Sequence, residues 1–421
     1  MEKKSNFGKF LLLWAGELIS SVGGGLTSFG LGVYIFRQTG SAANMALVTL
    51  LGFLPTLLLG VPAGVLADRY DRRLLLMIGD GCSALGILYI LIAMQNGGAS
   101  LTQICVGVFV SSVFSALLEP SFRATITDLL TDEEYSKANG LVSLAGSARY
   151  LFSPVIAGFL LSVSDIRLLL LIDIATFILT VISTAVVRRR LGSKKAESKE
   201  GFLESFREGW SILKGKKGVL ILVAISSGIT LFMGMFQILA EPMILSFADE
   251  KTLGVAETVC ASGMLAGGLY LGIRGLKSGY VRILSVALAL AGFFMAGFGL
   301  FESIIPIMLF GFLFFASLPF ANNCLDYLVR TNIPDEAQGR VWGMIGFISQ
   351  LGYVAAYAVS GKAADILGQT TGRGVGRGAA LVIIFAGILQ GMVAILIPLS
   401  GKIRELEKET VIYQTLKEEN A

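Results

Sequence analysis

Histidine is absent from the sequence, and charged residues are few. Lys, Arg, Asp and Glu make up 15% of the 421 residues, whereas 54% are hydrophobic. Without histidine the chain lacks the usual proton carrier near neutral pH and the commonest metal ligand, so any proton chemistry must use carboxylates. So few charges exclude a soluble protein of this size, because its core could not bury that much apolar surface.

Cysteine is scarce as well, and its four residues lie far apart: Cys82, Cys105, Cys260 and Cys324. All four fall inside apolar segments, so the sequence predicts neither a disulfide framework nor a metal site, and we expect them to be packing residues. A phosphate-binding loop ending in Gly-Lys-Ser is also missing, which excludes a built-in ATPase motor. We therefore expect neither an enzyme nor a bound metal or cofactor.

Long apolar segments and 51 glycines are what the chain has instead. Runs such as LVTLLGFLPTLLLGVPAGVLA, residues 47–67, suit membrane helices, whereas a barrel needs short alternating segments. Glycine fits this interpretation because it lets membrane helices pack closely. A window of about 19 residues predicts about twelve spans, near 10–36, 43–66, 74–94, 100–127, 138–163, 167–187, 219–245, 253–273, 281–301, 305–329, 338–367 and 378–399.

These spans form two groups of six, separated by one long polar stretch. We predict an N-terminal six-helix bundle at 1–187, an interdomain linker at 188–218, a C-terminal six-helix bundle at 219–400 and a tail at 401–421. The halves also resemble each other, because TDEEYSKANGLVSL from Thr131 matches IPDEAQGRVWGMIGF from Ile333. In the linker, Phe202, Phe206, Trp210 and Leu213 recur at helical spacing, which predicts an amphipathic helix at the membrane surface.

The distribution of Lys and Arg predicts the orientation of the chain. With the N-terminus in the cytoplasm, most of the 34 cationic residues lie on the cytoplasmic side, as the positive-inside rule requires. The N-terminus shows no small-residue cleavage site, so we interpret the first apolar segment as a span rather than a removed signal. We expect a multi-pass protein of the cell's inner (plasma) membrane with both termini cytoplasmic, and nothing in the net charge of +4 suggests nucleic acid as a partner.

The loop between the second and third spans carries the sharpest motif, GVLADRYDRR, at residues 64–73. The glycine permits close helix approach, the aspartate can accept hydrogen bonds, and the arginines can pair with carboxylates at a cytoplasmic gate. The alternative is that the arginines only set topology and contact lipid headgroups. The residues of this gate motif are Gly64, Asp68, Arg69, Arg72 and Arg73, with Glu119, Arg123 and Asp128 as candidate partners.

This loop resembles the signature of the major facilitator superfamily, although Asp71 stands where that pattern has Gly. Together with PSFRATITDLLTDEEYSKANGL, residues 120–141, it is most similar to the branch with macrolide efflux pumps and the enterobactin exporter. The resemblance implies an all-α integral membrane fold of twelve helices, in two six-helix bundles related by a pseudo-two-fold axis along the membrane normal. Aspartate still supports a tight turn, so we treat the exchange at Asp71 as minor.

The fifth span carries a partial second signature, GSARYLFSPVIAG, which resembles the Gly and Pro pattern of antiporters. Its helix-bending residues are Gly146, Ser153, Pro154 and Gly158, and Ser153 replaces a Gly of that pattern. Pro154 removes one backbone hydrogen bond, so it permits a bend in a helix that rocks. A static kink, with no rocking, is the alternative, because it would show the same residues in the sequence.

Charged residues inside the spans are the candidate sites for proton coupling or the substrate cavity, because each costs at least about 2.5–3.5 kcal/mol at the membrane centre. We select Glu17, Arg149, Asp173 and Glu241. Glu17 could exchange a proton or be a solvated gate residue, and Arg149 could line a cavity or make a structural ion pair. Structural pairing is the alternative for Asp173 also, and we interpret Asp80 and Asp326 as gate or topology residues.

We therefore expect a monomeric secondary transporter that exports small amphipathic molecules, resembling macrolide-like drugs or siderophore-like metabolites, by proton antiport and alternating access. The expected partners are the small-molecule substrate, the proton as coupling ion and the lipid bilayer. A proton-coupled importer of a small metabolite and a non-transporting membrane sensor of the same fold remain alternatives.

Overall fold

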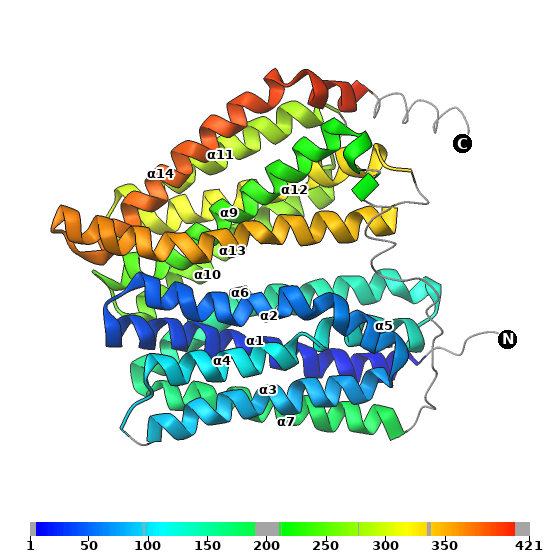
Figure 1. Ribbon diagram of the computed structural model, residues 1–421, viewed down its shortest axis with the longest axis vertical. Helices are drawn as coiled ribbons and strands as arrows, with labels where there is room; N and C mark the ends of the chain where they lie inside the picture. The colour runs from blue at the N-terminus through cyan, green and yellow to red at the C-terminus, as the bar shows by residue number, and fades with distance from the viewer. Residues whose placement is uncertain are drawn as a thin grey trace. The chain divides into compact units, whose positions relative to one another are not determined.

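The computed structural model describes residues 6–95, 97–189, 210–211, 213–276, 278–334 and 338–408, and this part of the chain contains helices and no strand (Figure 1). Its α-helices are α1 (Phe7–Thr39), α2 (Ala42–Arg69), α3 (Arg72–Gln95), α4 (Leu101–Ser115), α5 (Leu118–Leu129), α6 (Tyr135–Val163), α7 (Ile166–Arg189), α9 (Lys217–Leu245), α10 (Glu250–Arg274), α11 (Tyr280–Leu300), α12 (Ile304–Thr331), α13 (Gln338–Thr371) and α14 (Gly374–Leu396). Two short 3₁₀ helices are η1 (Asp132–Glu134) and η3 (Ile397–Leu399).

The predicted twelve spans are confirmed: 12 segments of the described chain are long and apolar enough to cross a membrane. The fourth of them differs from the expected single helix, because it consists of α4 and α5. Pro120 in the first turn of α5 has no N–H to donate to the carbonyl of Ala116, and Leu117 N instead donates to Phe114 O at 3.1 Å. The chain therefore breaks between Ser115 and Leu118.

Local signals set the helix ends. Gly40 ends α1 in the left-handed region at φ 61°, where its N–H donates to Phe36 O. The Ser41 hydroxyl then caps α2 by accepting from Asn44 N at 3.2 Å, and Ser100 forms a capping box with Gln103 at the start of α4. Two long apolar helices can thus be joined by only two residues.

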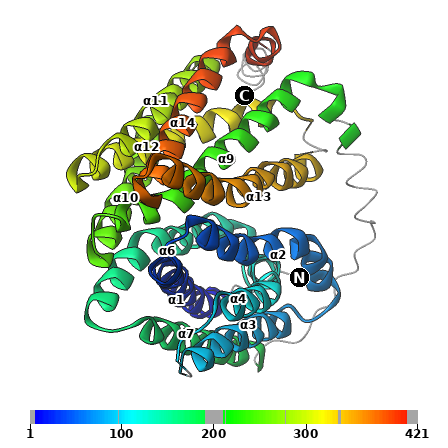
Figure 2. The ribbon, with the colours of Figure 1, turned by 60° about the vertical axis from the view of Figure 1, so that its left-hand side comes forward.

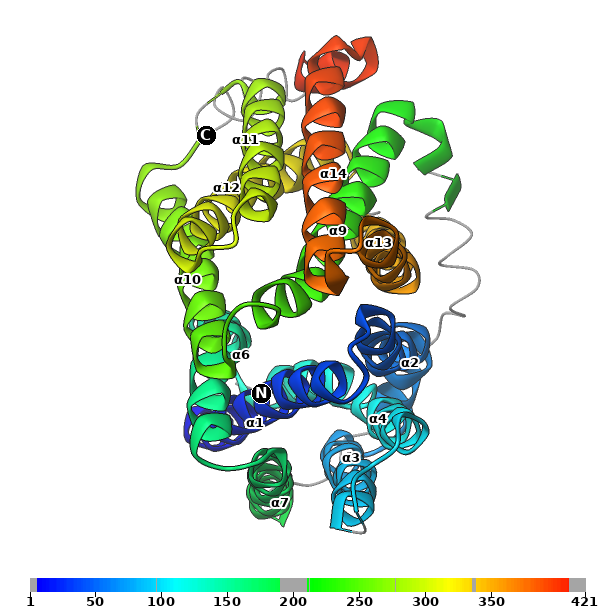
Figure 3. The ribbon, with the colours of Figure 1, turned by 90° about the vertical axis from the view of Figure 1, so that its left-hand side faces the viewer.

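The helices group into two compact units. One unit contains α1–α7 and residues 248–258, which include the first turns of α10, and the other contains α9, the rest of α10 and α11–α14. In the first unit, α1 contacts both α6 and α7, and α3 contacts both α4 and α7 (Figure 3). The second unit repeats these pairings, since α9 contacts α13 and α14, and α11 contacts α12 and α14 (Figure 2). This repetition fits two halves of the same topology.

The predicted linker lies partly outside the described residues, which exclude 190–209 and 212 and hence Phe202 and Phe206. Leu213 is 1% exposed and packs in the apolar core of the second unit, with Trp210 against that core. The start of the tail packs there too, through Ile403 and Leu406. Leu213, Ile403 and Leu406 therefore contribute to a core, whereas the sequence suggested a membrane surface for Leu213.

Candidate functional site

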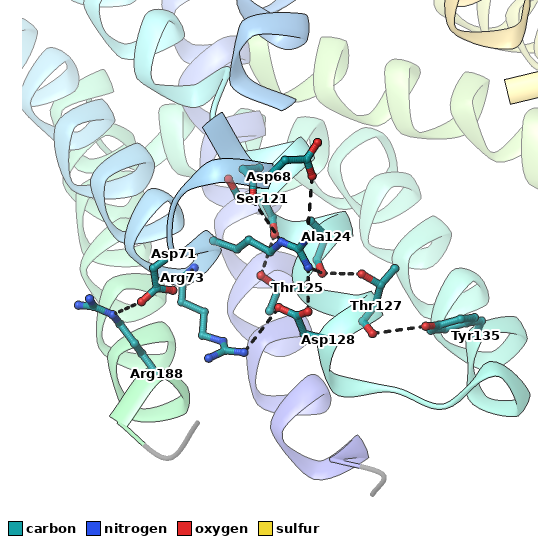
Figure 4. A network of polar contacts seen from close by, with 12 residues as sticks. Asp68, Asp71, Arg73, Ser121, Ala124, Thr125, Thr127, Asp128, Tyr135 and Arg188 are labelled. Atoms are coloured by element: carbon teal, nitrogen blue, oxygen red, sulfur yellow. Dashed lines mark hydrogen bonds and ion pairs between the residues drawn. The ribbon is translucent and has the colours of Figure 1, made fainter. Parts of the chain in front are cut away.

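The loop motif between α2 and α3 forms a polar network with α5 (Figure 4). Arg72 donates from Nη1 to Asp128 Oδ1 at 2.8 Å and to the Ala124 carbonyl at 2.9 Å, and from Nε to the Ala67 carbonyl at 3.2 Å. Asp68 lies farther away, with its Oδ1 3.9 Å from Arg72 Nη2. Arg72 therefore bridges the end of α2 and the last turns of α5 with one planar guanidinium.

Arg73 adds a second cation beside the same carboxylate. Its Nη2 lies 3.8 Å from Asp128 Oδ2, and the residue is 5% exposed. Its Nε has no hydrogen-bond partner among the described residues. Because little of its guanidinium reaches water, Arg73 depends on the nearby Asp128 carboxylate to balance its charge.

Asp71 occupies the turn itself and accepts from two directions. Its Oδ1 accepts from Arg73 N at 3.1 Å, and its Oδ2 accepts from Arg188 Nε at 2.7 Å. Burial acts to raise the pKa of Asp71, but the hydrogen bonds from Arg188, Arg73 and Leu74 outweigh it and hold that pKa below its ordinary value. Asp71 is therefore an ionised link between this loop and the end of α7.

The remaining residues of the predicted gate motif are not brought into this network. Glu119 and Arg123 pair with each other at 2.9 Å, with side chains 75% and 67% exposed. Arg69 is exposed, and a Cβ added to Gly64 would meet no atom within 4 Å. Of the candidate carboxylates on this segment, Asp128 binds the motif arginines and Glu119 does not.

The fifth span, α6, is joined to α1 by three side-chain hydrogen bonds to backbone carbonyls. Trp14 Nε1 donates to Leu141 O at 2.7 Å, Ser21 Oγ to Ala145 O at 3.4 Å, and Ser153 Oγ to Val22 O at 3.0 Å. Ser153, where the antiporter pattern has Gly, thus makes a specific contact with α1. The contact is close because α1 carries glycines there.

The other helix-bending residues differ in their surroundings. A Cβ on Gly158 would lie 2.5 Å from the Glu250 carbonyl, and the Pro154 carbonyl packs against Gly254 in the first turns of α10. A Cβ on Gly146 would meet nothing within 4 Å. Close packing therefore explains Gly158 and does not explain Gly146.

Three carboxylates on three helices of the first unit lie inside its apolar spans, and one of them interacts electrostatically with the other two. They are Glu17 on α1, Asp80 on α3 and Asp173 on α7, and Asp80 feels the charges of both others. Asp80 is 5% exposed and Asp173 is 1% exposed. Asp173 Oδ1 accepts no hydrogen bond among the described residues, although the hydroxyls of Thr27 and Thr176 lie near this carboxylate. Such groups are costly in a membrane unless they have a function.

Arg149 on α6 is a cation whose charge acts on two of these three carboxylates. Its charge acts on Glu17 and on Asp173, yet it makes no ion pair within 4.0 Å in the described part of the chain. The guanidinium is exposed. Arg149 can therefore stabilise an ionised carboxylate nearby without being neutralised by a fixed partner.

Glycines on the inner side of α1 allow this arrangement. A Cβ on Gly23 would lie 2.9 Å from Asp173 Oδ1 and 2.5 Å from Thr176 Oγ1, and a Cβ on Gly16 would lie 2.9 Å from Ser183 Oγ. The backbone of α1 thus approaches the polar side of α7 directly. The stretch after Glu17 is glycine-rich for packing as well as for flexibility.

Two further acids lie inside apolar helices, Glu241 on α9 and Glu257 on α10. Glu241, selected from the sequence, lies on α9 beside Pro242 in the second unit and is half-buried. Glu257 on α10, within the first unit, was not singled out, although a charge inside an apolar span is the signal that could have found it. The place of Asp80 near a helix end predicts a gate or topology residue, and its burial is visible only in the fold.

No metal centre is apparent in the described ranges, where no three His, Cys, Asp or Glu side chains lie together as ligands. Carboxylates in such a setting can take up and release protons and can pair with cations.

Known membrane transport proteins are similar to this chain over nearly its whole length. The chain is 27% identical over 422 residues to macrolide efflux protein A of Streptococcus pyogenes, covering 97% of this chain and 100% of the relative. It is 22% identical to the multidrug efflux pump Tap of Mycolicibacterium fortuitum, covering 95% and 97%.

Solved structures of transporters share the fold at low identity. A bacterial homologue of the iron transporter ferroportin in the inward-facing state matches with a TM-score of 0.72 and 16% identity, covering 93% of this chain and 99% of that one. The POT family transporter PepTSo matches with a TM-score of 0.75 and 13% identity, covering 95% and 98%. The sequence model of the Major Facilitator Superfamily matches residues 13–357. This chain therefore belongs to the major facilitator superfamily of membrane transporters.

Proposed function

We propose that this protein exports small amphipathic molecules by proton antiport, with Glu17, Asp80 and Asp173 as the proton-carrying group. The observation that carries the proposal is that Asp80 on α3 and Asp173 on α7 are buried, and that Asp80 interacts electrostatically with both Asp173 and Glu17 of α1. Full-length similarity to a macrolide efflux protein supports the export direction and the amphipathic substrate class. The sequence has no histidine that could serve instead.

The physical basis is the cost of charge in an apolar span. An ionised carboxylate without a partner is unfavourable there, so closing the site to water favours protonation of the acid, and opening it to water favours proton release. Arg149 places a positive charge near Glu17 and Asp173, which offsets part of the cost of the ionised carboxylates when water enters. Proton exchange is thereby coupled to whichever change of conformation admits water.

The loop network is the proposed conformational element. Arg72 and Arg73 hold the α2–α3 loop against Asp128 of α5, and Arg188 holds Asp71. We assign this end of the first unit to the cytoplasmic side, with residues 1–187 and 219–400 as the two moving bundles and 188–218 as the linker. Breaking and remaking these charged contacts accompanies alternating access.

The test is export from proteoliposomes under an imposed pH gradient, with a panel of macrolides and amphipathic dyes. We expect the gradient to drive export and a protonophore to abolish it. Glu17→Gln and Asp173→Asn should remove the gradient-driven component. The matched control is Asp165→Asn, which removes a 60% exposed carboxylate from the loop before α7.

The outcomes separate the alternatives. Gradient-driven accumulation in the opposite sense would identify an importer, and binding without flux would identify a sensor. Transport that ignores the protonophore, or that survives both substitutions, would overturn the proposed coupling.

A further inference from the structure

The second unit contains a cavity of about 300 Å³ between α9, α12 and α13. Its walls combine aliphatic side chains with hydroxyl, carboxylate, amide and aromatic groups, among them Ser226, Thr230, Asp326, Trp342, Gln350 and Tyr353. All of them belong to the second unit, so the cavity is defined within one compact body. Its volume is in the range of small-ligand sites.

Asp326 supplies a negative charge to this cavity. Asp326 is exposed, and no cationic side chain in the described part of the chain forms an ion pair with it within 4.0 Å. The cation that acts on it is Arg330, one helical turn later on α12. The carboxylate is therefore available to pair with a ligand cation.

Hydroxyl groups and the Gln350 amide form the rest of the non-aromatic polar lining. Thr230 donates to Ser227 O at 2.9 Å and also to the Ser349 carbonyl, and Ser349 Oγ donates to Ser226 Oγ at 2.9 Å. These bonds use hydroxyl donors between α9 and α13. Gln350 Oε1, in contrast, is buried and accepts no hydrogen bond among the described residues. An unsatisfied buried acceptor is costly, so a donating ligand would gain from it.

Two aromatic side chains complete the lining. Trp342 and Tyr353 lie on α13, one near each end of the run that faces the cavity. Tyr353 packs on Tyr357 with ring centroids 5.8 Å apart, and Trp342 packs against the apolar core, so both have supporting neighbours. Aromatic faces attract cations as well as apolar groups.

We propose that this cavity binds an organic cation, with its positive group beside Asp326 and its apolar body against Trp342, Tyr353 and the aliphatic wall. The inference rests on the proposed export function, because it names the substrate class of that function as cationic amphiphiles. Anionic compounds are disfavoured by the Asp326 carboxylate. A neutral isostere gains the apolar contacts and lacks the ion pair.

The experiment uses Trp342 as a local reporter. The sequence has three tryptophans, so Trp14→Phe with Trp210→Phe leaves Trp342 alone in the full-length protein. The purified protein in a non-ionic detergent is titrated at pH 8 with N-benzylpyridinium, a permanent cation that quenches tryptophan. The uncharged isostere 4-benzylpyridine is the competitor.

We expect saturable quenching that 4-benzylpyridine does not reverse. In the same background, Asp326→Asn should weaken binding at least about tenfold, which corresponds to about 1.4 kcal/mol. Asp326→Glu should retain binding because it keeps the charge. Glu302→Gln, which removes a 66% exposed carboxylate at the α11–α12 turn, should leave binding unchanged.

Thermal melting of each variant establishes that it is folded, and Asp326→Ser replaces Asp326→Asn if the latter unfolds. Unaltered affinity in the folded Asp326 variant, or equal binding of the neutral isostere, would overturn the inference. Cation binding at Trp342 without export would refute the proposed function and leave the cavity assignment standing. Proton-driven export with no cation sensed by Trp342 would do the reverse.

Discussion

Arg188 near the end of α7 donates a 2.7 Å hydrogen bond to Asp71 in the turn between α2 and α3. The two residues are 117 positions apart in sequence. Asp71 stands where the signature of the major facilitator superfamily has Gly. The turn by itself requires only a residue that can adopt the turn conformation. The structure gives this aspartate a second task, because its other oxygen accepts from Arg73 N. The exchange of Gly for Asp thus adds a contact to α7 that Gly could not make.

The Asp71–Arg188 pair should make stability depend on pH in acid. Because the pKa of Asp71 is held below the value of about 3.9 expected for an unfolded aspartate, the pair stabilises the fold fully above that pH. Its contribution is lost as the pH falls through the lowered folded pKa. Asp71→Asn should therefore melt at most about 2 °C lower than the parent at pH 7, because a partly exposed pair contributes less than about 1 kcal/mol.

The measurement is intrinsic-fluorescence melting of both proteins from pH 7 to pH 3. The difference should shrink as the pH falls below about 3.9, the ordinary pKa of aspartate, and Arg188→Gln should behave in the same way as Asp71→Asn. A difference that persists unchanged at pH 3 would contradict an ionic origin.

Removing Asp128 should cost more than removing an exposed carboxylate. Asp128→Asn leaves Arg72 and the nearly buried Arg73 without their anion, and we expect a loss of about 3 kcal/mol. Glu119→Gln breaks the exposed pair with Arg123 and should cost less than about 1 kcal/mol. Unfolding in a denaturing detergent measures both, and equal losses would contradict the structural difference.

Arg72→Lys should not substitute for Arg72. Lysine keeps the charge but cannot reach Asp128 and the carbonyls of Ala67 and Ala124 with one planar group. We expect Arg72→Lys to recover less than half of the stability lost in Arg72→Gln. Full recovery would mean that charge alone matters at this position.

Gly25→Ala should destabilise the packing of α1 on α6. The added Cβ would overlap Ser153 and lie 3.1 Å from Arg149 Cγ, and such overpacking costs about 1–3 kcal/mol. Ser153→Gly in the same chain should restore much of that loss because it removes the overlapping atoms. Gly24→Ala is the matched control, since its Cβ meets nothing within 4 Å and alanine favours helix. Melting temperatures of the four proteins decide the point, and an equal effect at Gly24 would exclude a steric cause.

Asp80→Asn should stop gradient-driven export as completely as Glu17→Gln does. A gate residue at a solvated helix end would give a milder effect, whereas Asp80 is buried beside Glu17 and Asp173. Transport in proteoliposomes with and without a pH gradient distinguishes these cases. Retention of gradient dependence in Asp80→Asn would remove this residue from the proton-carrying group.

The sequence alone was sufficient for the membrane class, the twelve spans and the loop motif. Long apolar runs predict membrane-spanning helices, because the bilayer core offers no hydrogen-bond partners and a helix satisfies its backbone N–H and C=O groups internally. The motif arginines also predicted a carboxylate partner on the fourth span, with Glu119 and Asp128 as candidates. The break between α4 and α5 was foreseeable from Pro120 and was not predicted.

The tertiary structure alone decided which charged residues share a site. A helix that is apolar on nearly all sides has no periodicity to show which side faces its neighbours, so the sequence could not place Glu17, Asp80 and Asp173 together. Choosing Asp128 over Glu119 depended on the rotation of α5, and the cavity beside Asp326 depended on how α9, α12 and α13 cross. The sequence thus determined which segments enter the membrane, and packing determined which side chains meet there. The physical reason is that contacting side chains lie on helices far apart in the chain, and the distance between two helices in sequence does not say which of their sides face each other.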